Sequence, residues 1–376
     1  MNEIKYLCWD IHKDIYVEKE FGNLLKAARA FLQCKEVEAE EIINKILMES
    51  TNEKVKSYGE EILLSIMFWQ NRYLEIEKLS LLAEEKKNLV MSIMGFYNNP
   101  DYKIIDNGKQ ATMNMPNIME GLPAIKARIN DCEVNLLFDT GSMVTVLSHK
   151  VAKASGISID SQSNTLEGQN AIGNILNPTP VQVKNIKINN IEIENKMCLV
   201  LPNEMLEFGV DEAGDIRQID GTIGWDIIKD FRWTIDFNKG EISLEISRPI
   251  IERKNMCCDF YPMINLLYGN NNMCLGLDTG ANNTVFRKST ALELGKLEKS
   301  NIEVYSAGGT VQEEGYIIPE LDLYINGEVA KIKNATVRES IHNNTNNFIL
   351  PGIIGSDIAK GKKLLIDFPN RFFSLV

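Results

Sequence analysis

Apolar residues in the first hundred positions recur at the spacing of helices that bury one face. The clearest set is Phe21, Leu24, Leu25, Ala28, Phe31 and Leu32. The pattern returns at residues 42–47 and 55–67, with Asn52 among the capping residues before the second of these. Further helices are expected at about 72–85 and 88–97. The sequence therefore predicts a helical module over residues 1–98.

From residue 118 onwards, apolar and polar residues alternate over short segments, as they do in strands. Examples are residues 181–193 and 316–325, with turns expected at 189–190 and 326–327. Short helices are expected at 150–154, at 289–294, and after Gly224 and Gly355. Residues 99–117, which contain Asn107-Gly108 and Pro116, predict a linker between the helices and the strands.

The β part of the chain contains an internal repeat. Residues 136–146 (LLFDTGSMVTV) align with residues 275–285 (LGLDTGANNTV) at an offset of 139, and residues 223–227 align with 354–358 at an offset of 131. Such self-similarity sets the architecture of a chain. The sequence therefore predicts two homologous lobes, residues 118–249 and 250–376, joined near Arg248-Pro249.

Each copy of the repeat places Asp-Thr-Gly at the end of an apolar strand. The two copies are Asp139, Thr140 and Gly141, and Asp278, Thr279 and Gly280. The Asp can ionise, the Thr hydroxyl can bond locally, and the Gly allows a tight turn and close approach. Two such carboxyls about 3 Å apart share one proton. One carboxyl can then activate water while the other polarises a carbonyl group.

With both motifs in view, the chain resembles aspartic proteases of the retropepsin and pepsin superfamily in a single-chain form. In that family each Asp-Thr-Gly is followed by two apolar residues and Gly, and residues 222–224 and 353–355 stand at those places. The resemblance covers roughly residues 118–376 and implies the acid protease fold, with a cleft between two mainly-β, retropepsin-like lobes. An endopeptidase that needs no metal, no organic cofactor and no dimerisation is implied.

The same resemblance assigns roles to the loop residues. Asp139 and Asp278 would be catalytic, Thr140 and Thr279 would bond across the lobes, and the glycines that follow would face water and substrate. The next residues differ, because Ser142 carries a hydroxyl and Ala281 does not. Since a hydrogen bond to a charged carboxyl lowers its pKa, we expect Asp139 to be ionised and Asp278 protonated. Asp226 and Asp357 also repeat, and we expect them to cap helices or pair structurally.

A hairpin flap over the cleft is a further feature that the resemblance implies for each lobe. The candidate segments are residues 167–173, with Gly168 and Gly173, and residues 305–310, with Gly308 and Gly309. Glycines there permit tight turns and mobility. Plain surface hairpins are an equal alternative.

The composition limits the class of protein and its partners. The 376 residues, 44% hydrophobic and 24% charged, are typical of a soluble globular protein of two or three domains. A net charge of −12 argues against nucleic acid as a partner. Neither a secretory signal nor a membrane span is evident. Seven cysteines, an odd number without framework spacing, indicate buried reduced thiols rather than a zinc site, and the expected location is the cytoplasm.

The expected partner is a peptide or protein substrate, and one dedicated substrate is favoured over bulk digestion. The paired helices resemble tetratricopeptide-type (TPR-like) hairpins, which implies docking of a substrate, a leader peptide or a regulator. A stabilising cap on the first lobe is the equal alternative. A non-catalytic peptide-binding protein with a degenerate cleft and a metal-dependent hydrolase are the alternatives to a protease.

Overall fold

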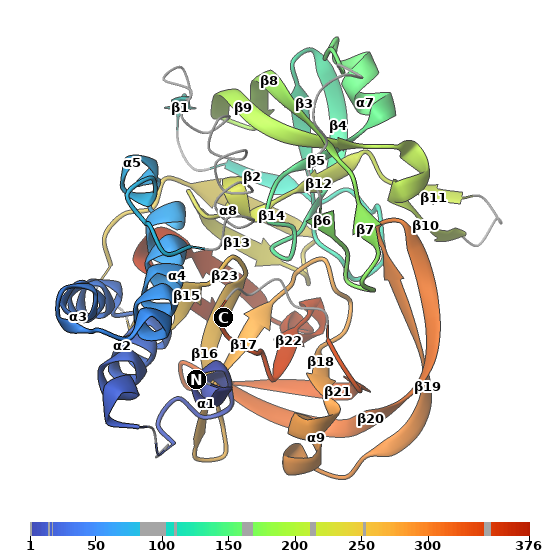
Figure 1. Ribbon diagram of the computed structural model, residues 1–376. Helices are drawn as coiled ribbons and strands as arrows, with labels where there is room; N and C mark the ends of the chain where they lie inside the picture. The colour runs from blue at the N-terminus through green and yellow to red at the C-terminus, as the bar shows by residue number, and fades with distance from the viewer. Residues whose placement is uncertain are drawn as a thin grey trace.

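The computed structural model of the chain describes residues 2–13, 16, 18–82, 103–108, 111–159, 168–210, 216–250, 253–341 and 347–376. Helices gather near the N-terminus and strands dominate the rest (Figure 1). The N-terminal helices are α1 (Asn2–Lys5), η1 (Leu7–Trp9), η2 (Lys19–Phe21), α2 (Gly22–Leu32), α3 (Glu36–Glu49), α4 (Glu53–Trp69) and α5 (Tyr73–Ile76). The Asn52 side chain accepts hydrogen bonds from the first turn of α4, which confirms it as the cap.

The first β unit is a seven-stranded sheet within the described residues, and it closes because β8 pairs with both β3 and β9. Its strands are β1 (Lys103–Asp106), β3 (Ala124–Ile129), β4 (Cys132–Phe138), β5 (Val146–Ser148), β8 (Thr179–Ile188), β9 (Ile191–Leu201) and β12 (Gly221–Ile223). The remaining elements are α7 (His149–Ala154), α8 (Trp225–Ile228), η3 (Asn203–Leu206), and the pairs β6 (Gly168–Gln169) with β7 (Ile175–Leu176) and β10 (Glu207–Val210) with β11 (Ile216–Gln218).

The second β unit is an eight-stranded sheet in the described part of the chain, closed by a pairing of β16 with β20. Its strands are β15 (Met256–Cys258), β16 (Pro262–Tyr268), β17 (Asn271–Leu277), β18 (Val285–Arg287), β19 (Glu298–Ser306), β20 (Gly309–Ile325), β21 (Glu328–Arg338) and β22 (Gly352–Ile354), accompanied by α9 (Lys288–Leu294), η4 (Ser356–Ala359) and η5 (Phe368–Asn370). The succession β16-β17-β22-β18-β21-β20 repeats β3-β4-β12-β5-β9-β8 of the first unit. Each sequence repeat thus folds into the same strand order.

A five-stranded sheet joins the two units and lies between them in Figure 1. Its order is β2 (Ala111–Asn114), β14 (Glu241–Glu245), β13 (Arg232–Asp236), β23 (Lys363–Asp367) and β24 (Phe372–Leu375). In the β13–β23 pair, Arg232 faces Asp367 and Asp236 faces Lys363, with Thr234 and Leu365 at the centre. The repeat offset of 131 maps this pairing onto itself, so a local two-fold axis passes through the Thr234–Leu365 pair.

Two of the predicted elements need correction. The linker at 99–117 is not a plain loop, because β1 pairs with β9 and β2 pairs with β14. The helix predicted at 72–85 is α5, which ends at Ile76, and the buried Glu60 carboxylate then accepts the N–H groups of Ser80 and Leu81 in the following turn. Residues 83–85 and the predicted helix at 88–97 lie outside the described residues.

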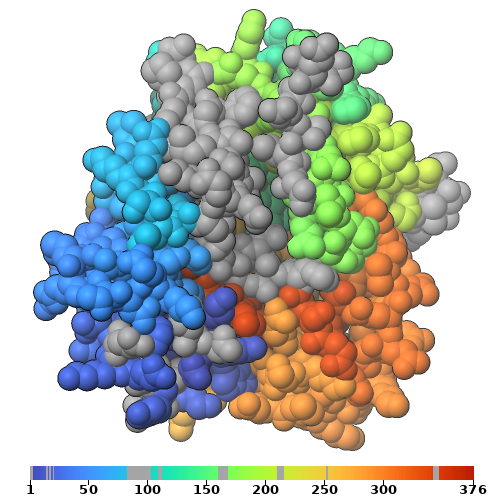
Figure 2. Space-filling view, viewed as in Figure 1, coloured from blue at the N-terminus to red at the C-terminus, as the bar shows by residue number. Residues whose placement is uncertain are grey.

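The helical module packs on the second β unit and also touches the first, where Lys229 Nζ donates to Asn71 Oδ1 at 3.4 Å. The Phe31 ring stacks on Phe348 with centroids 5.8 Å apart. Glu36 accepts two bonds from the Arg371 guanidinium, at 2.8 and 2.9 Å. Helices and both units share one continuous hydrophobic core, and Figure 2 shows the blue helical residues lying directly against orange and red ones. These buried contacts favour a stabilising role over a detachable docking module.

The structure shows the state of the cysteines and the length and apolar character of the described helices. All seven cysteines are free, and six of them are buried, with Cys132 half-buried. The prediction of buried structural thiols is confirmed for those six. Within the described ranges, no helix has the length and apolar character needed to cross a membrane.

Candidate active site

The two Asp-Thr-Gly loops begin at equivalent places in the two β units. Asp139 follows β4 and Asp278 follows β17, and each of these strands pairs in parallel with the strand of the apolar-apolar-Gly segment. Asp139 N donates to Ile223 O at 3.1 Å, and Asp278 N donates to Ile354 O at 2.9 Å. The same backbone anchor therefore fixes both aspartates.

Thr140 and Thr279 tie the two loops together across the local two-fold axis. Each backbone N–H donates to the hydroxyl of the other threonine at 3.0 Å. The Thr140 hydroxyl in turn donates to Leu277 O at 2.8 Å, and the Thr279 hydroxyl donates to Phe138 O at 2.7 Å. Both threonines are buried. Four reciprocal hydrogen bonds thus hold the loops in one geometry.

These hydrogen bonds predict that loss of the Thr140 hydroxyl lowers the stability of the protein. Replacing Thr140 by Val removes the donor to Leu277 O and leaves the Thr279 N–H without an acceptor. We expect a loss of about 1–3 kcal/mol in the free energy of unfolding for each buried group left unsatisfied. Urea denaturation followed by circular dichroism measures it. Thr140→Ser keeps the hydroxyl and is the control, and equal stability of the Val and Ser variants would contradict the prediction.

Each glycine of the motif lets the opposite carboxyl approach the loop. A Cβ atom added to Gly141 would lie 2.6 Å from Cγ of Asp278, and one added to Gly280 would lie 2.6 Å from Cγ of Asp139. Real Cβ atoms do not tolerate such contacts. The absence of side chains at these two positions therefore permits the aspartates to meet.

Burial and mutual repulsion set the protonation of the pair. Burial raises the pKa of Asp139 well above its usual value, and the neighbouring Asp278 raises it further. Burial also raises the pKa of Asp278. The N–H groups of Gly141 and Ser142 donate to Oδ1 of Asp139 at 2.9 and 3.2 Å, and Gly280 N donates to Oδ1 of Asp278 at 2.9 Å. Such a pair holds one proton over a wide pH range.

The hydrogen bond on which the expected distribution of that proton rests is not formed. The Ser142 hydroxyl donates to Val144 O at 2.8 Å instead of to Asp139. The Tyr261 hydroxyl, outside both motifs, acts to lower the pKa of Asp278. These two observations favour a proton on Asp139 and the charge on Asp278. The sequence motifs did not point to Tyr261. The signal that could have found it is the repeat alignment, in which the offset of 139 places Tyr261, with its hydroxyl, opposite the apolar Leu122.

Asp226 and Asp357 bind their own units, as expected for structural carboxylates. Asp226 Oδ1 accepts from the backbone and the hydroxyl of Thr145, both at 2.9 Å. Asp357 accepts the same two bonds from Thr284, at 2.9 and 2.7 Å. Each threonine hydroxyl also accepts a bond from Gly224 or Gly355. These hydrogen bonds connect each Asp-Thr-Gly loop to the apolar-apolar-Gly segment of the same β unit.

The two candidate flaps touch each other. Gly168 opens the β6–β7 hairpin, in which Gly173 has a positive φ of 87°, and Gly308 lies in the turn between β19 and β20, with Gly309 as the first residue of β20. β19 and β20 extend from the second unit to the side of β7 and β10 (Figure 1). Glu167, the first residue of one candidate segment, lies outside the described residues.

Hydrogen bonds join the tips of these hairpins. Asn170 Nδ2 donates to Ala307 O at 2.6 Å, and Ala171 N donates to the Ser306 hydroxyl at 3.2 Å. Gly308 N donates to Met205 O at 2.8 Å. The two hairpins therefore bridge the two β units, with their tips closed against each other.

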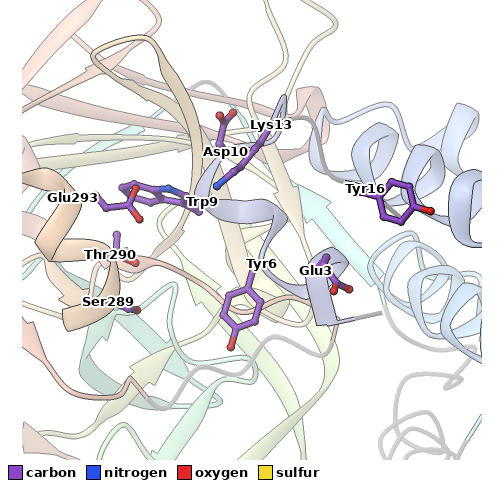
Figure 3. Close-up of a pocket in the computed structure, with 9 residues that line it drawn as sticks. All are labelled: Glu3, Tyr6, Trp9, Asp10, Lys13, Tyr16, Ser289, Thr290 and Glu293. Carbon is purple, nitrogen blue, oxygen red and sulfur yellow. The ribbon is translucent and has the colours of Figure 1, made fainter. Parts of the chain in front are cut away.

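Two pockets differ in their relation to the aspartates. A pocket of about 640 Å³ borders the second Asp-Thr-Gly loop and is lined from both units, including Gly121, Asn282 and Asn283. A pocket of about 530 Å³ lies between the N-terminal segment, with Tyr6 and Trp9, and helix α9 (Figure 3). No residue of either Asp-Thr-Gly motif lines the first or the second of these pockets. The first pocket is the nearer to a motif in the chain, because Asn282 follows Gly280 by two residues.

Comparison with known proteins gives one family. Residues 125–210, which include Asp139, match the family described as gag-polyprotein putative aspartyl protease. The match supports the interpretation of this chain as a retropepsin-like aspartic protease. A solved structure, a retropepsin-like aspartic protease from Rickettsia conorii, is similar at 15% sequence identity over 40% of this chain and 97% of that one, with a TM-score of 0.26. A search of curated protein sequences found no match.

Proposed function

We propose that the chain is a single-chain aspartic endopeptidase with Asp139 and Asp278 as its catalytic pair. The observation that carries the proposal is the paired, half-buried carboxyls, brought together by reciprocal threonine bonds and by glycines at the two positions where a side chain would block the approach. A binding protein needs no such shared proton. Structural aspartates find fixed cationic or hydrogen-bonded partners, as Asp226 does, whereas burial raises the pKa of both Asp139 and Asp278, and Asp278 raises that of Asp139 further.

The mechanism follows from the protonation of the pair. Asp278, ionised, takes a proton from a water molecule, whose oxygen attacks the carbonyl carbon of the scissile peptide bond. Asp139, protonated, donates its hydrogen bond and then its proton to the carbonyl oxygen. When the tetrahedral intermediate collapses, the C–N bond breaks, the leaving nitrogen receives the proton from Asp278, and a hydroxyl group of the intermediate returns a proton to Asp139 as the new carboxyl group forms. No bond to the enzyme forms, and the pair returns to its starting state.

The substrate in this proposal is a peptide segment held beneath the two joined hairpins. The pocket beside Asn282 and Asn283 offers amide groups to a peptide backbone, and it draws residues from both units. The hairpins must part to admit a chain, because Asn170 and Ser306 bond across the two tips. This requirement favours a dedicated peptide or protein substrate over bulk digestion. A cytoplasmic location and a TPR-like docking role of the helices stay predictions.

A peptide library tests the proposal directly. The protein and its Asp139→Asn/Asp278→Asn double variant are incubated with the same library at several pH values, and the cut sites are read by mass spectrometry. We expect internal cleavages that the double variant does not make and that a metal chelator does not inhibit. Cleavage by the double variant, or loss of cleavage with the chelator, would overturn the aspartic mechanism. Binding without any cleavage would favour the degenerate-cleft alternative.

A further inference from the structure

Tyr261 breaks the symmetry of the two units next to the catalytic pair. The repeat offset of 139 aligns Leu122 with Tyr261 and Leu137 with Gly276. In the first unit both positions are leucines of one apolar cluster. In the second unit, a Cβ atom on Gly276 would lie 2.8 Å from Cε1 of Tyr261, so the missing side chain makes room for the phenol ring. Asp278 stands two residues after Gly276.

The Tyr261 hydroxyl is buried close to the pair, and no described residue holds it in a hydrogen bond. The residue is 3% exposed. Within the described ranges, its hydroxyl has no hydrogen bond of ordinary geometry. A buried hydroxyl without a partner is costly, so such a group usually serves a purpose. The groups that act on Asp278 are Asp139, Tyr261 and the N–H groups of Gly280 and Ala281.

Helix α4 of the N-terminal module holds the bend from which Tyr261 projects. The bend is the turn between β15 and β16, where Cys258 pairs with Pro262. Its central residue, Phe260, has a φ of 57°, and the aligned position in the first unit is Gly121, with a φ of 78°. The left-handed region suits glycine and is uncommon for a bulky residue. A local reason must therefore keep phenylalanine there.

That reason is contact with the helix. The Phe260 ring lies 5.1 Å from Phe68 and 6.1 Å from Trp69, centroid to centroid. The Ser65 hydroxyl donates to Asp259 Oδ1 at 2.6 Å. Asn347 donates to both oxygens of the buried Asp259, at 2.6 and 2.7 Å. The first unit, with Gly121 at this place, has no aromatic ring there for a helix to hold.

We propose that helix α4 positions the Tyr261 hydroxyl to donate a hydrogen bond to Asp278, so that the single negative charge of the pair resides on Asp278 and the proton on Asp139. The inference rests on the proposed function, because a fixed charge matters only if the pair activates water. It also gives the helical module a role in catalysis through the bend, without contact with the substrate. Tyr261 is thus a positioning residue, and α4 supports it.

The test is a titration of the pair that does not depend on turnover. The carboxyl carbons of ¹³C-labelled Asp139 and Asp278 are followed by NMR against pH in the full-length protein, with Asp→Asn variants for assignment, and the pH–rate profile is recorded wherever a cleaved peptide is known. In Tyr261→Phe we expect the lower apparent pKa of the pair to rise by about one unit, because a donor to the charged form is lost. Ser65→Ala should shift it in the same direction by less.

A matched control and the contrary outcomes complete the design. Tyr268→Phe, at the end of the strand β16 that follows Tyr261, removes a hydroxyl that donates to Leu294 O at 2.5 Å and should leave the titration unchanged. An unchanged lower pKa in Tyr261→Phe overturns the role of the phenol. If that variant does not fold, Ser65→Ala decides, and no shift there overturns the role of α4. A shifted titration in a protein that cuts no peptide leaves this inference standing and defeats the proposed function.

Discussion

Replacing either Asp139 or Asp278 by Asn is expected to abolish peptide cleavage, with kcat falling by roughly 10²- to 10⁴-fold or more. Asn at 278 cannot take the proton from water, and Asn at 139 cannot deliver one to the carbonyl oxygen. Each change therefore removes one of the two proton transfers, and the double variant should be no more active than the weaker single variant. Initial rates on a peptide identified from the library measure the effect.

The same variants should fold more stably at neutral pH, which separates lost chemistry from lost structure. The folded pKa of Asp139 lies well above its ordinary value, so the native state binds more protons than the unfolded state between those two values. Stability from this source is present at acid pH and falls as the pH rises through the folded pKa. Asn cannot ionise and escapes that loss.

Thermal denaturation at two pH values checks this expectation. We expect a higher Tm for Asp139→Asn than for the wild type at pH 7 and a smaller difference near pH 4. Asp220→Asn, at a surface carboxylate that accepts the Asn135 N–H, is a control for removal of a charge elsewhere. A lower Tm at pH 7 together with lost activity would mean that the carboxyl is needed for the fold.

The elements that the sequence predicted best are those that the repeat presents twice. The helices α7 and α9 begin 139 positions apart, as the repeat predicts, and the turns at 189–190 and 326–327 lie where the alternation placed them. Local chemistry suffices for these, since the turn residues Asn189 and Asn326 both adopt a positive φ. In contrast, β1 and β2 form only because distant strands offer free edges, and their own composition is typical of loops.

The sequence could not predict which aspartate of the pair carries the proton, because that depends on the hydrogen-bond partners of two hydroxyl groups in the folded protein. Ser142 can donate to its aspartate or to the Val144 carbonyl, and the sequence does not rank these acceptors. The Tyr261 hydroxyl comes from a bend 17 positions before Asp278 and belongs to no motif. Its position depends on α4, nearly 200 residues away in the chain. Likewise, helical periodicity shows which face of α2 is buried but not which β unit covers it.

Replacing Lys196 by Met is expected to lower the free energy of unfolding by about 3–5 kcal/mol, because it leaves a buried carboxylate without its cation. Lys196 Nζ lies 3.0 Å from Asp226 Oδ2, and the two side chains are 2% and 0% exposed. The second unit shows the alternative: burial raises the pKa of Asp357, and the cation that acts on this carboxyl is the exposed Lys360.

Urea denaturation measures this effect, and two further variants interpret it. Lys360→Met, beside Asp357, removes an exposed charge and should change stability by no more than about 0.5 kcal/mol. Lys196→Met/Asp226→Asn removes both charges and keeps an acceptor for Thr145, so it should recover most of the loss. If the double variant is as unstable as Lys196→Met, the damage comes from lost packing of the lysine stem. If it recovers, the buried ion pair with Asp226 is the reason that position 196 requires lysine. The first β unit, which contains Asp139, then needs a buried cation at this place. The second β unit, which contains Asp278, has no need of one.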